Sequence, residues 1–158
     1  MSDIKMDVVS PERVTQTAVQ LAGLMIRTSN LAEQHTATQK IAPLWQRYFA
    51  ERVQTHRDGQ LMYGVYYDYQ SDMDGEFSLL AGTTATEAQA CDLTLIAGDY
   101  LKFSAQGEMP QCVINLWQQV WRYFASPKCE YQRCYLTDYE VYLDSHRVEI
   151  YIGIKPLT

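Results

Sequence analysis

The order strand, helix, strand, strand occurs twice along this chain, and that repeat restricts the fold more than any other feature. Runs of apolar and β-favouring residues predict strands, whereas apolar residues at intervals of three and four predict helices. The predicted strands are residues 15–28, 61–69, 77–82, 93–103, 134–142 and 148–154, and the predicted helices span 41–49 and 113–124. Short traces support the repeat, since Leu44-Trp45-Gln46 recurs as Leu116-Trp117-Gln118. We therefore predict an α+β fold, a pseudo-twofold tandem β-α-β-β repeat with two antiparallel sheet halves, one main helix in each half and a ligand cleft between them.

Each predicted helix has an apolar face that must pack against the rest of the protein. This face comprises Ile41, Leu44, Trp45, Tyr48 and Phe49 in the first helix, and Val113, Trp117, Val120, Trp121 and Phe124 in the second. Pro43 suits the first helix only within its first turn, where a backbone N–H has no intrahelical partner. Each tryptophan is either a core residue or a ligand contact, and the pattern leaves both interpretations open.

The last two predicted strands form a hairpin joined at residues 143–146, and a carboxylate, Glu140, stands in the middle of its first strand. An unpaired buried charge is costly, so Glu140 either faces water or is buried for a purpose. Our interpretation is that it awaits a cation. The alternative is an open sheet face that Glu140 shares with Glu149, and a single bulge would reverse the strand parity.

Composition and charge narrow the class of protein. The chain has 158 residues, 47% hydrophobic and 20% charged, which suits one globular domain, and its net charge is −6. Only 13 basic residues are spread along it, which argues against direct nucleic-acid binding, and the negative balance suits a cationic ligand. The sequence has neither a membrane-span pattern nor a signal peptide, so we expect no membrane association and a cytoplasmic location. Residues 1–12 read as a leader, too short to hold a helix-turn-helix.

No metal, cofactor or triad site emerges from the polar residues. The acidic turn at 70–76 fails as a calcium loop, because Gln70 stands at position one and Ala81 at position twelve, so we predict a hairpin turn. The four cysteines lack a C-x-x-C pair and the three histidines are isolated, which predicts structural thiols and no metal site. Asp144, Ser145 and His146 are consecutive turn residues and cannot adopt a triad geometry. The strand at 93–103 is predicted to kink or bulge at Gly98.

Six motifs, in order, resemble those of the GyrI-like effector-binding domains. They are Ile41-Ala-Pro-Leu-Trp45; Tyr63-Gly-Val-Tyr66 with Asp68-Tyr69 and Gly75-Glu-Phe77; Ile96-Ala-Gly-Asp-Tyr100 with Phe103; Val120-Trp121; Tyr139-Glu140-Val-Tyr142; and Val148-Glu-Ile-Tyr-Ile152. These are the ligand domains of AraC-type and related multidrug-responsive regulators, and they also stand alone as integron-associated effector-binding proteins, the form that this chain resembles most. The resemblance runs from about residue 18 to 154, and it implies a single domain over 1–158 with halves at about 15–85 and 91–155.

The resemblance also implies an aromatic pocket between the halves that binds lipophilic organic cations, with a glutamate of the penultimate strand as charge partner. By motif position that glutamate is Glu140, and the expected ligand-binding residues are Glu140, Tyr66, Trp117, Trp121, Tyr142 and Tyr63. While the pocket is empty, we expect a raised pKa at Glu140 or hydrogen bonds to it from tyrosine hydroxyls such as Tyr66 or Tyr142. The sequence departs from the family pattern at Gly153, where a proline is usual, and at Ala97-Gly98, which lacks a proline that often precedes it.

Three functions fit these expectations. The first is a small-molecule effector-binding protein without catalysis or cofactor, linked to transcriptional regulation or drug response through a separate regulator protein. The second is a hydrolase of the same superfamily in which Glu140, with Tyr66, activates water as a general base. The third is an inhibitor whose acidic surface engages a protein partner such as DNA gyrase.

Overall fold

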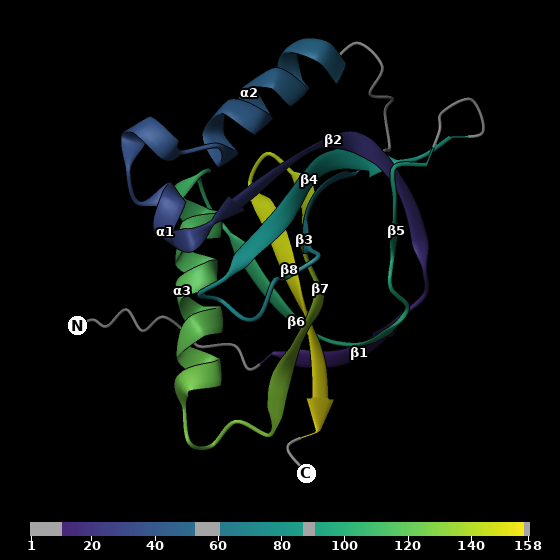
Figure 1. Cartoon of the computed structure of the whole chain (residues 1–158). Helices are drawn as coiled ribbons and strands as arrows, with labels where there is room; N and C mark the ends of the chain where they lie inside the picture. The colour runs from purple at the N-terminus through teal and green to yellow at the C-terminus, as the bar shows by residue number, and fades with distance from the viewer. Residues whose placement is uncertain (1–10, 53–60, 87–90, 157–158) are drawn as a thin grey trace.

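The computed structural model describes residues 11–52, 61–86 and 91–156, which form one curled, antiparallel sheet of eight strands with helices packed against it (Figure 1). The strands are β1 (Glu12–Gln16), β2 (Val19–Ser29), β3 (Met62–Tyr67), β4 (Glu76–Thr84), β5 (Leu93–Leu95), β6 (Gly98–Gln106), β7 (Tyr131–Asp144) and β8 (Arg147–Pro156). The helices are α1 (Asn30–Glu33), the short 3₁₀ helix η1 (Thr36–Thr38), α2 (Ile41–Arg52) and α3 (Gln111–Ala125). The predicted α+β class is confirmed. Within the described ranges, no helix combines the length and apolarity that a membrane span requires.

The two predicted halves lie next to each other in the sheet with the same internal strand order. The first half runs β2-β4-β3 and the second β6-β8-β7. They meet where β3 pairs antiparallel with β7, from Met62 opposite Tyr142 to Tyr67 opposite Thr137. The junction of β3 and β7 is therefore the centre of the pseudo-twofold arrangement.

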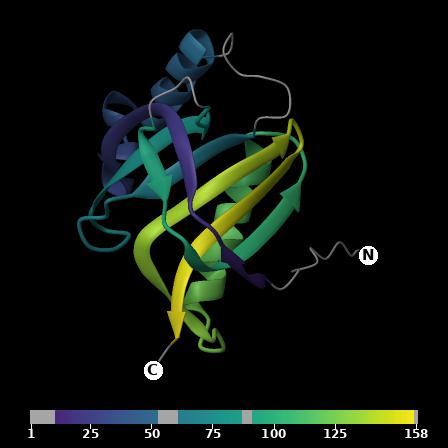
Figure 2. The ribbon, with the colours of Figure 1, turned by 90° about the vertical axis from the view of Figure 1, so that its right-hand side faces the viewer.

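Two short strands, β1 and β5, each pair with a strand of the other half, at the two edges of the sheet. Strand β1 pairs with β6 at one edge, but the chain continues directly into β2 near the other edge. Strand β5 in turn pairs with β2 before the chain continues into β6. Strand β5 was predicted as part of the longer strand 93–103, whereas only the last two residues of β1 fall in the predicted strand 15–28. The predicted kink at Gly98 is confirmed, since Gly98 begins β6 with a φ of 154°. The sheet curls as a result (Figure 2).

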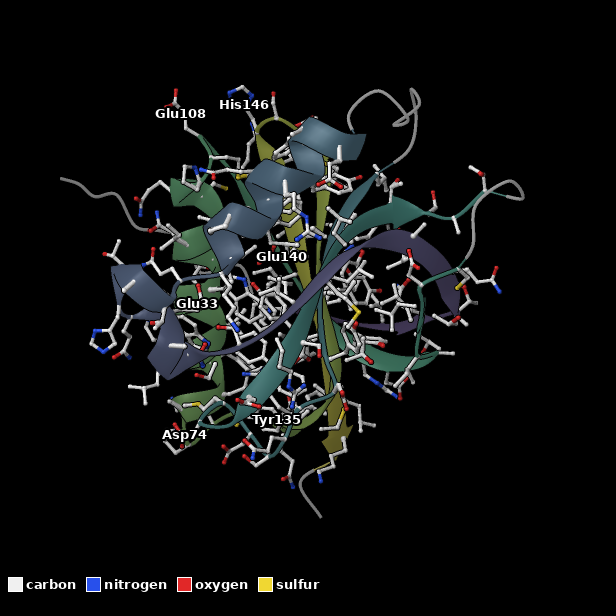
Figure 3. All side chains as sticks on the ribbon, turned by 45° about the horizontal axis from the view of Figure 1, so that its top comes forward. Glu33, Asp74, Glu108, Tyr135, Glu140 and His146 are labelled. Atoms are coloured by element: carbon white, nitrogen blue, oxygen red, sulfur yellow. The ribbon has the colours of Figure 1, made fainter. Side chains whose placement is uncertain are left out.

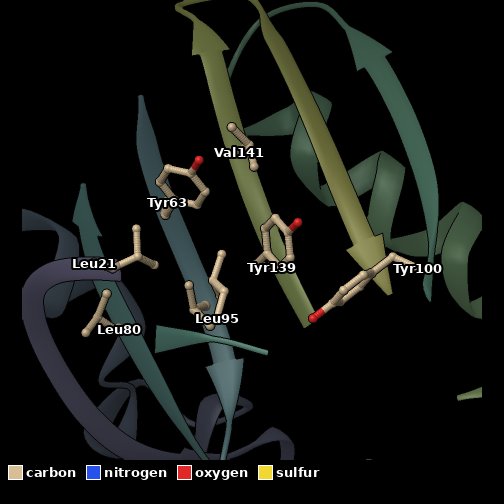
Figure 4. Close-up of a cluster of buried hydrophobic side chains, with 8 residues drawn as sticks. Leu21, Tyr63, Leu80, Leu95, Tyr100, Tyr139 and Val141 are labelled. Carbon is tan, nitrogen blue, oxygen red and sulfur yellow. The ribbon is translucent and has the colours of Figure 1, made fainter. Parts of the chain in front are cut away.

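Alternate residues of the central strands belong to different hydrophobic clusters, because successive side chains of a strand point to opposite faces of the sheet. One face lies inside the curl and buries Leu21, Val65 and Leu80 completely, with Tyr63 and Tyr139 beside them (Figure 4). The other face carries α2 and α3.

The helices pack as amphipathic elements, although one predicted face is partly wrong. Leu44 and Tyr48 of α2 are buried as predicted. On α3 the buried residues are Cys112, Leu116 and Val120, spaced four apart, so Trp121 falls beside this stripe and is 49% exposed. Both predicted hairpin turns are confirmed, since β3 pairs with β4 and β7 with β8. Most of the predicted leader, residues 1–10, lies outside the described residues.

A glycine pair allows β2 and β4 to approach closely, and we expect Gly82→Ala to destabilise the protein. A Cβ on Gly82 would lie 2.4 Å from the carbonyl oxygen of Ala22, so the strands must move apart. We expect the free energy of unfolding, measured by urea denaturation, to fall by about 1 to 3 kcal/mol. Ser104→Ala, at an exposed position of β6, is the control and should change it by less than about 0.5 kcal/mol. Wild-type stability for Gly82→Ala would contradict the close approach.

Candidate functional site

A cavity of about 210 Å³ opens between α3, the start of α2 and the β3–β4 turn. Its wall is mostly apolar and aromatic and contains Asn30, Ile41, Tyr66, Tyr69, Met73, Phe77, Ile114, Trp117, Trp121 and Arg133. Concave, mainly apolar surfaces with a few polar groups are typical of small-molecule sites.

The carboxylate of Glu140 lies directly behind this wall. The residue is only 4% exposed and sits near the middle of the molecule, between the helices and the sheet (Figure 3). Opposite it on β3 stands Gly64, where a Cβ would come within 2.9 Å of Glu140 Oε1. The glycine therefore makes room for the carboxylate.

Three aromatic side chains donate hydrogen bonds to Glu140. The indole Nε1 of Trp117 and the hydroxyl of Tyr66 reach Oε2 at 2.6 and 3.1 Å, and the hydroxyl of Tyr142 reaches Oε1 at 2.7 Å. Burial raises the pKa of Glu140, although these hydrogen bonds from Tyr142, Trp117 and Tyr66 each oppose the rise. Burial, followed by the Glu140 charge, likewise raises the pKa of Tyr66 well above its ordinary value. Both expectations for Glu140 are confirmed, and the bond from Trp117 is an addition that the strand pattern did not indicate.

The aromatic rings of the site are arranged edge to face around the carboxylate. Tyr66 and Trp117 cross at 74° with centroids 5.3 Å apart, and Trp45 of α2 meets Tyr142 at 78° and 5.7 Å. Trp121 lies beside Trp117 at 6.1 Å and forms part of the exposed rim. Such edge-to-face pairs are favourable arrangements of ring quadrupoles and hold the rings in place.

Of the six expected site residues, five gather here and Tyr63 does not. Tyr66, Trp117 and Trp121 line the cavity, and Glu140 and Tyr142 adjoin it. The placement of Tyr63 was wrong, because it differs by an odd number of positions from Tyr66 and so points into the curl of the sheet, where it packs on Tyr139.

Glu149 does not share a face with Glu140. It pairs with Val141, one position further along β7, and its carboxylate accepts from Tyr151 and lies 3.7 Å from Lys102. The alternative of two carboxylates on one open face is therefore excluded.

A second polar group at the cavity was missed in the sequence. Asp138, fully buried, accepts from Arg133 Nη2 at 2.7 Å and from the Tyr69 hydroxyl at 2.6 Å through Oδ2, and from the Gly153 N–H at 2.9 Å through Oδ1. The available signal was the two-residue spacing from Asp138 to Glu140, which places both on one face. The position of Arg133 gave no such signal, since it depends on an irregularity of β7.

The remaining wall is positioned by Glu33, which caps α2. Its carboxylate accepts from the backbone N–H groups of Lys40 at 2.9 Å and Ile41 at 3.2 Å, the donors that a helix start leaves free. Asn30 of α1 donates to the carbonyl of Met73 at 2.8 Å, which links α1 to the β3–β4 turn. Within the described ranges, no group of histidine, cysteine, aspartate and glutamate side chains is arranged to hold a metal ion.

Comparisons with known proteins find a matching family and similar folds. Residues 14–154 match the family described as integron-associated effector binding protein. An integron cassette protein from the mobile metagenome of Vibrio cholerae has a similar structure, with a TM-score of 0.85, 34% identity and coverage of 92% of this chain and 96% of that one. A protein solved with tetraphenylphosphonium bound is similar in fold, with a TM-score of 0.71, 24% identity and coverage of 93% and 94%. Among curated proteins, none matches the sequence.

We expect Gly64→Ala to disturb the carboxylate site. The added Cβ would lie 2.9 Å from Glu140 Oε1 and 3.0 Å from Trp45 Cζ2, so the carboxylate must shift away from Tyr142. The free energy of unfolding should fall by about 1 to 3 kcal/mol, measured by urea denaturation. In a Glu140→Ala background the same substitution should cost less, because the carboxylate is gone. Equal costs in both backgrounds would contradict the contact.

We also expect stability to depend on the protonation of Glu140. The unfolded chain loses this proton at a lower pH than the folded chain, because burial raises the folded-state pKa. As pH rises from about 4, the unfolded state therefore binds fewer protons and the contribution of Glu140 to stability falls. Relative to wild type, Glu140→Gln should gain stability between pH 4 and pH 7 in denaturation experiments. If the stability of Glu140→Gln relative to wild type stays constant or falls over this pH range, the pKa of Glu140 is not raised.

Proposed function

This chain belongs to the family of integron-associated effector binding proteins, and from that premise we propose that it binds a lipophilic organic cation in the cavity, with Glu140 as charge partner. The observation that carries the proposal is a carboxylate, 4% exposed, held by aromatic donors directly behind an aromatic wall.

The preference for a cation follows from the rings and the charge acting together. Tyr66 and Trp117 contribute both to the cavity wall and to the hydrogen bonds on Glu140. A ring that donates to a carboxylate is polarised by it, and a cation over such a ring gains about 0.5 to 2 kcal/mol when desolvated. A bound cation also favours the ionised form of Glu140, which burial alone disfavours.

The preference for a lipophilic ligand follows from the rim. Met73, Ile114 and Trp121 line the cavity and yet remain 47%, 46% and 49% exposed. An apolar ligand would cover these side chains and remove their surface from water. Pockets for drug-sized ligands commonly measure about 300 to 1,000 Å³. The cavity, about 210 Å³, is smaller, so a ligand of that size would extend across the rim.

The phosphonium complex of the similar fold supports this ligand class. Tetraphenylphosphonium is a delocalised cation covered by phenyl groups, and it forms no directional hydrogen bonds. Stacking and one buried charge set few directional requirements, which favours recognition of several such compounds.

We propose binding without turnover. Glu140 accepts three hydrogen bonds, which leaves about one of the four lone-pair sites of a carboxylate for a water molecule. A cation held over the rings needs no such site. The bound form would then be read by a separate regulator protein, as in an effector module of a transcriptional or drug response.

Titration with tetraphenylphosphonium, followed by tryptophan fluorescence, tests the proposal. Wild type should show saturable binding, and Glu140→Gln should bind at least tenfold more weakly, which corresponds to about 1.4 kcal/mol. Neutral triphenylmethane, which lacks both the charge and a hydrogen-bond acceptor, should bind weakly to both proteins. Rhodamine 6G, a lipophilic cation that carries a hydrolysable ethyl ester, should be recovered chemically unchanged after incubation with the protein.

Glu149→Gln is the matched control, since it makes the same change on the other face of the same hairpin and should keep wild-type affinity. Absence of binding by wild type, or equal affinities for wild type and Glu140→Gln, would overturn the proposal. Conversion of the ligand would favour the hydrolase instead.

A further inference from the structure

A guanidinium group lines the same cavity at some distance from Glu140. The side chain of Arg133 is 8% exposed and contacts the buried carboxylate of Asp138 through Nη2 at 2.7 Å. Burial is the largest single influence on the pKa of Arg133 and lowers it, but the charge of Asp138, the hydrogen bond to Asp138 and the neighbouring Tyr69 and Tyr135 together raise that pKa above its ordinary value, so the group stays cationic.

The carboxylate of this ion pair has hydrogen-bond partners on both oxygens, whereas the guanidinium has a nitrogen without one in the described part of the chain. Asp138 accepts from Arg133, the Tyr69 hydroxyl and the Gly153 N–H, so both of its oxygens have partners. Arg133 Nε, by contrast, is buried and has no acceptor among the described residues, while the guanidinium lies 4.4 Å from the Tyr135 ring centroid. Leaving a buried donor unpaired lowers stability, so an acceptor brought to Arg133 Nε would be favourable.

The backbone of β7 is bent to bring Arg133 to this position. Five positions of β7 separate Arg133 from Asp138, whereas only two separate their partners Ile154 and Ile152 on β8. The three extra residues reverse the strand parity, so Arg133 shares the helix-facing side with Asp138. One of them, Tyr135, has a φ of 53°, which is unfavourable for an aromatic residue. The irregularity therefore holds Tyr135 in an unfavourable backbone conformation and brings the Arg133 cation to the cavity wall.

Arg133 and Glu140 lie at different points along β7 and would therefore contact different parts of a ligand. Asp138 and Glu140 are two residues apart on one face of β7, which separates them by roughly 7 Å along the strand. Arg133 lies on the far side of Asp138 from Glu140. A third carboxylate would be repelled here by Asp138 and Glu140, whereas a neutral oxygen acceptor would not.

We propose that Arg133 forms a second subsite of the cavity, which binds a neutral hydrogen-bond acceptor. This inference rests on the proposed function and narrows it: the preferred ligand is a lipophilic cation that carries a carbonyl-type oxygen on an arm directed away from its cationic centre. A small rotation of the guanidinium lets its free edge meet that oxygen, and the bond to Asp138 is retained.

A matched pair of phosphonium ions tests the subsite. Hexyltriphenylphosphonium and (5-oxohexyl)triphenylphosphonium differ only by a ketone in the arm. An unpaired ketone loses its hydrogen bonds to water on binding, so without a donor the hexyl compound should bind more tightly. We expect wild type to bind the ketone at least fivefold more tightly than the hexyl compound in fluorescence titrations.

Two variants identify the donor. Arg133→Met combined with Asp138→Asn removes the ion pair as a unit, because loss of Arg133 alone would leave a buried charge without its partner. Arg133→Leu combined with Asp138→Asn likewise leaves no donor at position 133, so it serves if the first double variant fails to fold, as judged by thermal unfolding. In each folded variant the ratio of ketone affinity to hexyl affinity should fall to one or below, whatever the affinity for the hexyl compound itself.

Equal or tighter binding of the hexyl compound by wild type would overturn the subsite, as would a ketone preference that persists in a folded variant. If the hexyl compound still binds with dependence on Glu140, the cation-binding proposal stands and only the subsite falls. If wild type binds neither compound, both proposals fall together.

Discussion

The structure depends on how the buried carboxylate of Glu140 is accommodated. An ionised carboxylate away from water is costly unless donors surround it, and Trp117, Tyr66 and Tyr142 supply three donors from α3, β3 and β7. These side chains come from both halves of the chain, so the carboxylate couples the halves at the point where they join. Two of these donors, Tyr66 and Trp117, form part of the cavity wall, which connects the stability of the fold to the chemistry of the site.

The pseudo-twofold arrangement explains why the site lies where it does. Strands β3 and β7 pair at the centre of the sheet, and each half contributes one helix to the same face. Gly64 and Glu140 occupy opposite positions in that pair, and the missing side chain of one creates the space for the other. The two halves are therefore alike in topology and different in chemistry, as expected for a repeat in which only one copy carries the charge partner.

A departure from the family pattern has a structural reason in this chain. The resemblance leads one to expect a proline in the last strand where Gly153 stands. A proline has no backbone N–H, whereas Gly153 donates its N–H to Asp138, and a Cβ there would come within 2.9 Å of Cys134 Sγ and the Thr137 carbonyl oxygen. Gly153 thus belongs to the same local arrangement as Asp138, Arg133 and the irregularity of β7.

The repeated order of the main strands and helices, both hairpins, the kink at Gly98 and the unusual position of Glu140 could all be predicted from the sequence, because they follow from local periodicity and from a charge among apolar neighbours. The short elements β1, β5, α1 and η1 could not be separated in this way. The sequence did not determine which side of the sheet Tyr63 faces, how exposed Trp121 is, or that Arg133 reaches the cavity. The first two depend on which stripe of a strand or helix meets its neighbours. The third depends on three extra residues in β7, which reverse its parity, and such an irregularity exists only in relation to the partner strand. Only the tertiary structure decided these placements, because each is set by pairing between segments that lie far apart in the chain.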